Sequence, residues 1–173
     1  GGVAPELTQR GLDSFFRINN ADGYGKAMVG LIETKGAKSV AILYSNKEAT
    51  AAMATYVQKA LTDKGIKITS HEFDDTTTDF KPIMNKVKLQ DRPEVVAMIG
   101  YENDYIGILR AGAVLKPDVK AMVGVWSLAT AQMNKEFHDQ VQGVYGTSPL
   151  PYPVVFKGGE AQDFAAAYMN KYN

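Results

Sequence analysis

Three consecutive segments between Glu94 and Trp126 decide the fold of this chain. They read Glu94-Val-Val-Ala-Met-Ile-Gly100, Tyr101-Glu-Asn-Asp-Tyr-Ile-Gly-Ile-Leu-Arg-Ala-Gly112 and Lys120-Ala-Met-Val-Gly-Val-Trp126. The first and third are short, apolar and rich in β-branched residues, which is typical of strands covered on both faces. Apolar residues of the middle segment recur at helical spacing. The pattern therefore predicts a βαβ unit with two parallel strands.

The same alternation continues on both sides of this unit. Further apolar or alternating segments predict strands at 15–18, 39–44, 66–73 and 143–147. Helical periodicity predicts helices at 26–35, 49–64, 80–89, 129–139 and 160–172. The glycine-containing stretch 19–25 is expected to be a loop. Strands that alternate with helices predict an α/β fold, with a doubly wound, mostly parallel sheet and helices on both faces.

The chain is expected to form a single α/β lobe over residues 1–173. Its length is within the usual range for one domain, and no internal repeat or interdomain linker interrupts it. Residues 1–14 and 149–159 are expected to be irregular, because prolines and glycines punctuate them. The chain opens on Gly1-Gly2 without an initiator methionine, so we expect a processed or excised piece of a longer protein.

Composition narrows the classes of partner and site. Lysine plus arginine equals aspartate plus glutamate at 19 each, so no net charge attracts nucleic acid. Cysteine is absent, which excludes disulfides and thiolate chemistry, and the two histidines lie in no metal-binding motif. No apolar run approaches the ~20 residues that a membrane span needs, and no signal peptide is recognisable. We expect neither a metal nor another cofactor.

Enzyme motifs are scarce. Gly23-Tyr-Gly25 lacks the remaining glycines and the Ser or Thr of phosphate-binding loops. Asp74-Asp75 follows the strand from Ile66, whereas a receiver domain has its acidic pair after the first strand. Ser45 ends a predicted strand, but no histidine is placed to activate it. We therefore expect a protein that is not an enzyme.

Aromatic residues at strand ends indicate a ligand site. Tyr44, Tyr101 and Trp126 each stand at the carboxyl end of a predicted parallel strand. Ligands of open α/β sheets bind at this edge. Three aromatic side chains there would line a cleft with rigid apolar area and polar tips, which suits a small organic ligand. One such aromatic alone would be an ordinary core residue.

The residues also resemble a known family, the type I periplasmic binding proteins that serve as branched-chain amino acid receptors of ABC importers. The resemblance covers nearly the whole chain. No single motif carries it, but the segments follow the family's order. They are Ala4-Pro-Glu-Leu-Thr8, Phe15-Phe-Arg17, Val40-Ala-Ile-Leu-Tyr44, Asp79-Phe80, Val95 to Gly100, Ile108-Leu-Arg-Ala-Gly112 and Phe164-Ala-Ala-Ala-Tyr168-Met-Asn-Lys-Tyr172.

The resemblance implies a solute-binding protein with two lobes joined by a hinge, of which this chain is the second. Residues 1–14 and 149–159 would then lie near the hinge. The implied partners are a small-molecule ligand, the missing first lobe and the membrane permease of an ABC importer, and the implied location is the periplasm or the cell surface as a lipoprotein. An isolated lobe would expose the surface that its partner lobe covers, so we also expect self-association.

The ligand is expected to contact Tyr101, Trp126, Tyr44, Ser45 and Glu102. In the branched-chain receptors, the position similar to Trp126 carries an acidic residue that holds the ligand ammonium. Here Glu102, next to Tyr101, is a candidate substitute, and an exposed glutamate at a helix start is the alternative interpretation. A cleft lined by Tyr101 and Trp126 without a clear ammonium partner suggests a ligand other than a plain α-amino acid. The expected ligand is branched-chain amino acid-like, or an aromatic or aliphatic carboxylate or amide. Two alternatives stay open: a ligand-sensing regulatory domain of the same fold, and a flavodoxin-like enzyme or receiver domain.

Overall fold

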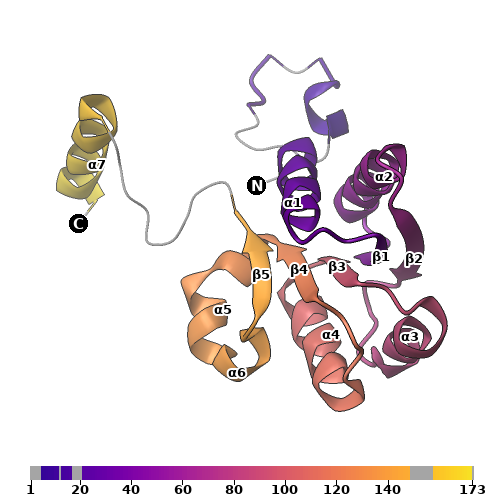
Figure 1. Ribbon diagram of the computed structural model, residues 1–173. Coiled ribbons are helices and arrows are strands. Elements are labelled where there is room, and N and C mark those ends of the chain that lie inside the picture. Colours follow the sequence, from indigo (N-terminus) through magenta and orange to yellow (C-terminus); the bar gives the residue numbers. More distant parts are fainter. Residues whose placement is uncertain (1–4, 12, 17–20, 149–157, 173) are drawn as a thin grey trace.

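A five-stranded parallel sheet forms the centre of the structure, a computed structural model that describes residues 5–11, 13–16, 21–148 and 158–172 (Figure 1). The strands are β1 (Ser39–Ser45), β2 (Lys67–Phe73), β3 (Val95–Ile99), β4 (Ala121–Val125) and β5 (Val144–Thr147). Their order is β2-β1-β3-β4-β5, and every neighbouring pair is parallel. This confirms the predicted fold class. The strand order reverses direction between β1 and β3, the position at which doubly wound sheets form a crevice.

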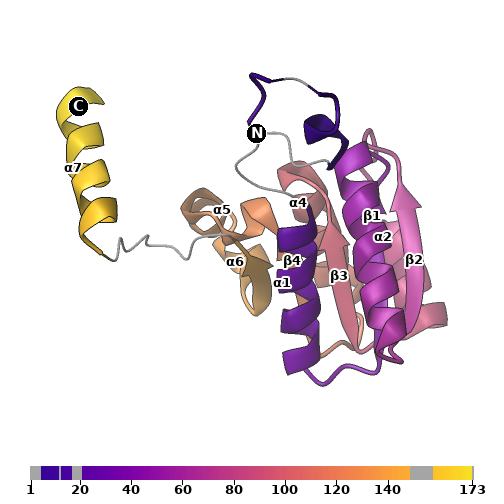
Figure 2. The same ribbon diagram turned by 90° about the horizontal axis from the view of Figure 1, so that it is seen from above.

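Helices cover both faces of the sheet (Figure 2). On one face lie α1 (Ala21–Thr34) and α2 (Glu48–Asp63). On the other lie α3 (Lys81–Lys86), its π-helical continuation η2 (Val87–Asp91) and α4 (Glu102–Leu115). The remaining helices are the 3₁₀ turns η1 (Pro5–Thr8) and η3 (Trp126–Ala129), the short helices α5 (Ala131–Glu136) and α6 (His138–Val141), and α7 (Gly159–Tyr172).

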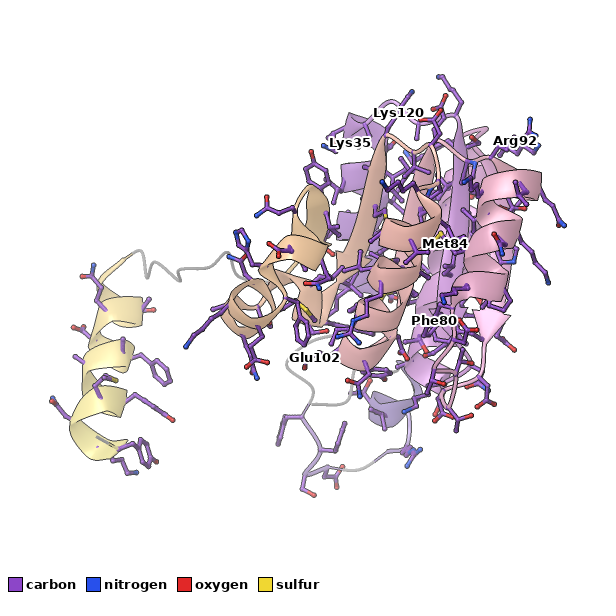
Figure 3. All side chains as sticks on the ribbon, turned by 90° about the horizontal axis from the view of Figure 1, so that it is seen from below. Lys35, Phe80, Met84, Arg92, Glu102 and Lys120 are labelled. Carbon is purple, nitrogen blue, oxygen red and sulfur yellow. The ribbon has the colours of Figure 1, made fainter. Side chains whose placement is uncertain are left out.

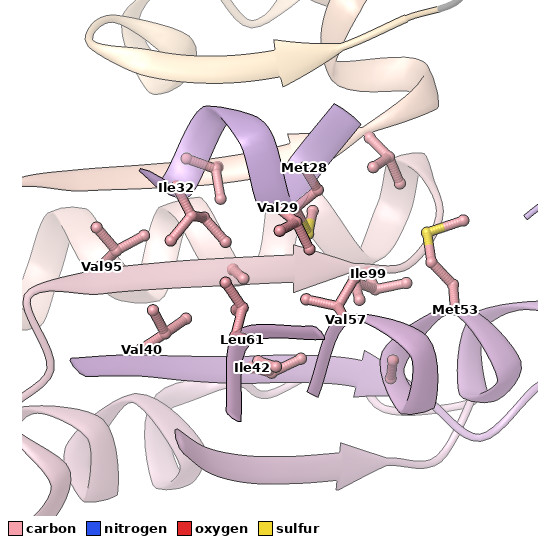
Figure 4. Close-up of a cluster of buried hydrophobic side chains, with 14 of the residues drawn as sticks. Met28, Val29, Ile32, Val40, Ile42, Met53, Val57, Leu61, Val95 and Ile99 are labelled. Atoms are coloured by element: carbon pink, nitrogen blue, oxygen red, sulfur yellow. The ribbon is translucent and has the colours of Figure 1, made fainter. Parts of the chain in front are cut away.

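The first core layer lies between the sheet and helices α1 and α2. Met28 and Ile32 from α1 and Val57 from α2 pack onto alternate residues of β1 and β3 (Figure 4). The strand residues in this layer are Val40, Ile42, Val95, Ala97 and Ile99. All of them are buried, because period-two alternation turns every second side chain of a strand to the same face.

The second core layer lies on the opposite face. Ala41 and Leu43 of β1 point into it, and Met84, Tyr105 and Ile108 of the covering helices close it. Each of these residues is fully or almost fully buried. Central strands with two covered faces are apolar at every position, which explains why β1 and β3 read as continuous apolar runs in the sequence.

Helix α1 begins at Ala21, so the prediction of a loop over 19–25 was wrong for the described residues of that stretch. Gly25 was taken as a turn residue, but it is a packing residue. A Cβ atom at Gly25 would lie 2.6 Å from Cδ1 of Tyr56, so the absent side chain lets α1 approach α2 closely. Tyr24, in the same helical turn, is buried.

Two further expectations differ from the structure. Phe15 and Phe16 are exposed and lie outside any strand, whereas the rest of the predicted strand at 15–18 lies outside the described residues. A strand needs a hydrogen-bonded neighbour. The edge strands of the described sheet are β2 and β5, and Phe15 and Phe16 pair with neither of them. The predicted helix at 129–139 is divided into η3, α5 and α6, with Phe137 between the last two.

Helix α7 stands apart from the sheet and its covering helices in both views (Figures 1 and 2). None of its residues is buried. The exposed aromatic rings of Phe164, Tyr168 and Tyr172 follow one another along the helix at a spacing of four residues. Within the described residues, no helix combines the length and apolar character needed to cross a bilayer.

Candidate ligand-binding site

The carboxyl ends of β3 and β4 bring Tyr101 and Trp126 together. Met98 of β3 is in register with Gly124 of β4, and each aromatic residue follows shortly after. The two rings are stacked, with centroids 5.7 Å apart and an angle of 21° between their planes. The two side chains therefore lie at one edge of the sheet, as predicted, and their rings are in contact. Their role in ligand binding stays a prediction.

Tyr24 also contacts Trp126. Its ring meets the indole edge-on, with centroids 5.5 Å apart, and its hydroxyl forms a hydrogen bond with the Trp126 side chain. The indole nitrogen is a donor only, so the Tyr24 oxygen accepts this bond. Burial, opposed by this hydrogen bond, raises the pKa of Tyr24. The sequence analysis missed Tyr24, although its spacing of four from Met28 and eight from Ile32 was the available signal.

The backbone of Trp126 is in the left-handed region, with φ of +55°. Bulky residues rarely adopt this conformation, and such strained residues gather at binding and active sites. Trp126 follows extended Val125 and is the first residue of the 3₁₀ turn η3, so the unusual φ turns the chain sharply at the end of β4. The turn sets the indole beside Tyr101, half-buried at the sheet edge.

Tyr105 joins the two strand ends from inside the protein. Its hydroxyl accepts a hydrogen bond from the backbone N–H of Gly100 at 3.2 Å, and it forms another with the backbone of Val125. These residues directly precede Tyr101 and Trp126. The Tyr105 side chain is fully buried, and this burial raises its pKa strongly. One neutral hydroxyl thus fixes the spacing of the two backbone segments that carry the aromatic pair.

The outer ring of the pair, Tyr101, is 42% exposed and has a cation beside it. The Lys47 ammonium lies 5.1 Å from the Tyr101 ring centroid and 3.3 Å from Oδ2 of Asp75. The Asp104 carboxylate accepts a hydrogen bond from the Tyr101 backbone N–H at 2.8 Å, which secures the start of α4. Sequence reasoning missed Lys47, which carries no recognisable motif.

The other predicted site residues are placed differently. Ser45 is fully buried, and its hydroxyl lies 2.8 Å from Thr50 Oγ1. Tyr44 is half-buried beside Glu72; burial first, and then the charge and hydrogen bond of Glu72, raise the pKa of Tyr44. Glu102 is the first residue of α4, half-buried next to Tyr101. Glu102 thus follows Tyr101 directly at the start of α4, whereas Ser45 is enclosed within the fold.

A hollow of about 500 Å³ lies at the opposite, amino end of the strands. Figure 3 shows Arg92 and Lys120 at that end and Glu102 at the other. The charged residues that line the hollow are Lys88, Arg92, Glu94, Lys116, Asp118 and Lys120. Two of these lysines already have partners in the fold. Lys88 donates a hydrogen bond to the Leu115 carbonyl at the end of α4, and Lys120 forms an ion pair with Glu94, which directly precedes β3. His, Asp and Glu side chains in the described ranges form no group of three that could hold a metal.

Comparison with known proteins places the chain in a family. The sequence pattern of the family described as "Periplasmic binding protein" matches residues 8–173. The leucine-, isoleucine-, valine-, threonine- and alanine-binding protein of Pseudomonas aeruginosa is 26% identical over 153 residues, which are 87% of this chain and 40% of that protein.

Solved structures show the same fold. A leucine-binding protein of Thermotoga maritima has a TM-score of 0.80 at 18% identity, over 98% of this chain and 48% of that one. A solute-binding protein of an ABC transporter from R. palustris, in complex with 4-hydroxybenzoate, has a TM-score of 0.69 at 20% identity, over 90% and 42%. The chain thus spans less than half the length of these relatives. It belongs to the periplasmic binding protein family and has the fold of one lobe of its type I members.

Proposed function

We propose that this chain is the second lobe of the solute-binding component of an ABC importer and that it contributes one side of the ligand-binding site. The observation that carries the proposal is the stacked pair Tyr101–Trp126 at the carboxyl edge of a parallel sheet, with Trp126 held in a strained backbone conformation. An exposed, preorganised aromatic surface suits an apolar ligand body, because little conformational freedom is lost when the ligand binds. Relatives that are ABC transporter solute-binding proteins support this function.

The proposed ligand is a small organic molecule: branched-chain amino acid-like, or an aromatic or aliphatic carboxylate or amide. Tyr101 and Trp126 form the platform, and Glu102 stands at its rim. Tyr44 and Ser45 form the end of the neighbouring strand β1. Ser45 is buried there, and its hydrogen bond with Thr50 supports this strand end. Relatives of both kinds support this ligand class, since one is named for leucine, isoleucine, valine, threonine and alanine and another is in complex with 4-hydroxybenzoate.

The chain supplies one wall of the proposed cleft. Its relatives are more than twice as long, which leaves room for a first lobe that closes over the ligand and excludes water. The other partner is the membrane permease of the importer, and the location is the periplasm or the cell surface. The aromatic row Phe164, Tyr168 and Tyr172 on α7 is exposed, which supports self-association of the lobe when it is alone.

Replacement of Trp126 by glutamate in the two-lobed protein is expected to shift ligand preference toward amino acids. A carboxylate at the end of β4 would bind the ligand ammonium by a charge-assisted hydrogen bond, which adds about tenfold in affinity. Isothermal titration calorimetry with L-leucine and 4-hydroxybenzoate measures the ratio of the two affinities. Phe164→Glu, at an exposed position on α7, is the control. An unchanged ratio in Trp126→Glu would contradict the role given to Trp126.

A further inference from the structure

We propose that Lys47 makes this site selective for anionic ligands, by binding the carboxylate of a molecule whose apolar body lies on Tyr101. This inference rests on the proposed function and narrows its ligand class. Lys47, a residue that the sequence alone did not indicate, would then recognise the charge of the ligand from this lobe. An α-amino acid, which carries an ammonium as well, and a neutral amide would both bind less well than the simple carboxylate.

The position of Lys47 follows from the fold. It is the residue before α2, with an extended backbone (φ −71°, ψ 146°), and it comes two residues after the end of β1. The carboxyl ends of β1 and β3 are neighbours in the sheet, so Lys47 lies at the same edge as Tyr101. Its ammonium is 5.1 Å from the exposed Tyr101 ring, and its side chain is 48% exposed. A ligand on that ring is within reach of the ammonium.

A network of loop contacts holds the ammonium in place. Asp75 pairs with Lys47 at 3.3 Å, and the Asp75 backbone N–H donates to Asn46 Oδ1 at 3.2 Å. The Asn46 side chain also donates to Asp74 at 3.2 Å. The loops that follow β1 and β2 are thus tied together. The ammonium has three donors, so it can keep Asp75 and still donate to a ligand carboxylate.

The two acidic residues that follow Tyr101 in the chain stabilise the start of α4. Asp104 is buried and accepts the Tyr101 backbone N–H, whereas Glu102 stands in the first turn of α4, where the helix dipole favours a negative side chain. A ligand ammonium at the ring would instead face Lys47 as a like charge. Within the described site, Lys47 is the charged side chain over the Tyr101 ring, so the site offers a charge-assisted donor to an anion.

The test uses Trp126 as its own reporter, because it is the sole tryptophan of the 173-residue chain. Benzoate and benzamide are the probes, since they share a ring and differ in charge, and L-leucine is the third. Fluorescence titration is expected to show benzoate binding about fivefold tighter than benzamide or leucine, the size of a partly exposed ionic contact. Lys47→Met is expected to remove this preference and Lys47→Arg to keep it.

Lys35→Met is a matched control. Lys35 also stands over an aromatic ring, 3.4 Å from the Tyr145 centroid, but at the end of the molecule away from Glu102 (Figure 3). It is expected to leave all three affinities unchanged, and thermal melts verify that each variant is folded. Equal binding of benzoate and benzamide, or a preference that survives Lys47→Met, overturns the inference and leaves the binding site standing. If none of the probes changes Trp126 emission up to about 100 mM, the proposed function at this site fails together with the inference.

Discussion

The Leu43→Ala variant is expected to lose about 3 kcal/mol of the free energy of unfolding. Leu43 is fully buried near the end of β1, opposite His71 of β2 and Met98 of β3 in the sheet register. Its side chain belongs to the core layer beneath α3 and α4. Removal of three carbons there forfeits their burial and leaves a cavity that a close-packed interior fills only in part.

Urea unfolding followed by circular dichroism measures this loss. The matched control is Leu89→Ala in η2, where the same side chain is 60% exposed. That variant is expected to change the free energy of unfolding by less than about 0.5 kcal/mol, because little apolar surface becomes newly exposed. Equal losses in the two variants would show that β1 is not the centre of the core.

The Tyr105→Phe variant is expected to lose about 1–3 kcal/mol, although the change removes a single oxygen atom. That oxygen accepts the backbone N–H of Gly100 and a backbone hydrogen bond from Val125, so phenylalanine leaves buried polar groups without their partner. The same strand ends carry Tyr101 and Trp126. The variant is therefore also expected to shift Trp126 emission and to weaken ligand binding.

The control for this variant is Tyr145→Phe, at a tyrosine that is 41% exposed on β5. Water replaces the lost contacts of an exposed hydroxyl, so we expect almost no change in stability. Chemical unfolding and the emission spectrum of Trp126 are measured on both proteins. A Tyr105→Phe protein with wild-type stability and emission would refute the role of the hydroxyl as a link between β3 and β4.

The site combines stability and strain in adjacent residues. Tyr105 and the apolar ends of β3 and β4 form a rigid base, since their side chains are fully buried. Above that base, Trp126 keeps an unfavourable backbone φ, and its neighbours Tyr24 and Tyr101 fix the ring. A binding surface held by a rigid scaffold costs little to organise when a ligand arrives.

Local sequence patterns determined the parallel α/β fold. The segment 94–126 became β3, α4 and β4 in the predicted order, because continuous apolar runs and helical spacing are properties of neighbouring residues. The same reasoning placed Tyr101 and Trp126 at one edge, since parallel strands end on the same side of a sheet.

Contacts between distant segments decided the rest. Gly25 reads locally as a turn, but the Tyr56 ring of another helix makes it a packing residue. Tyr24 and Lys47 joined the site only when α1 and the loop after β1 were placed against the strand ends. The sequence alone therefore determined the fold class and the edge that carries the aromatic pair. Tertiary packing decided which side chains surround that pair, because such contacts depend on the relative positions of elements that no local pattern encodes.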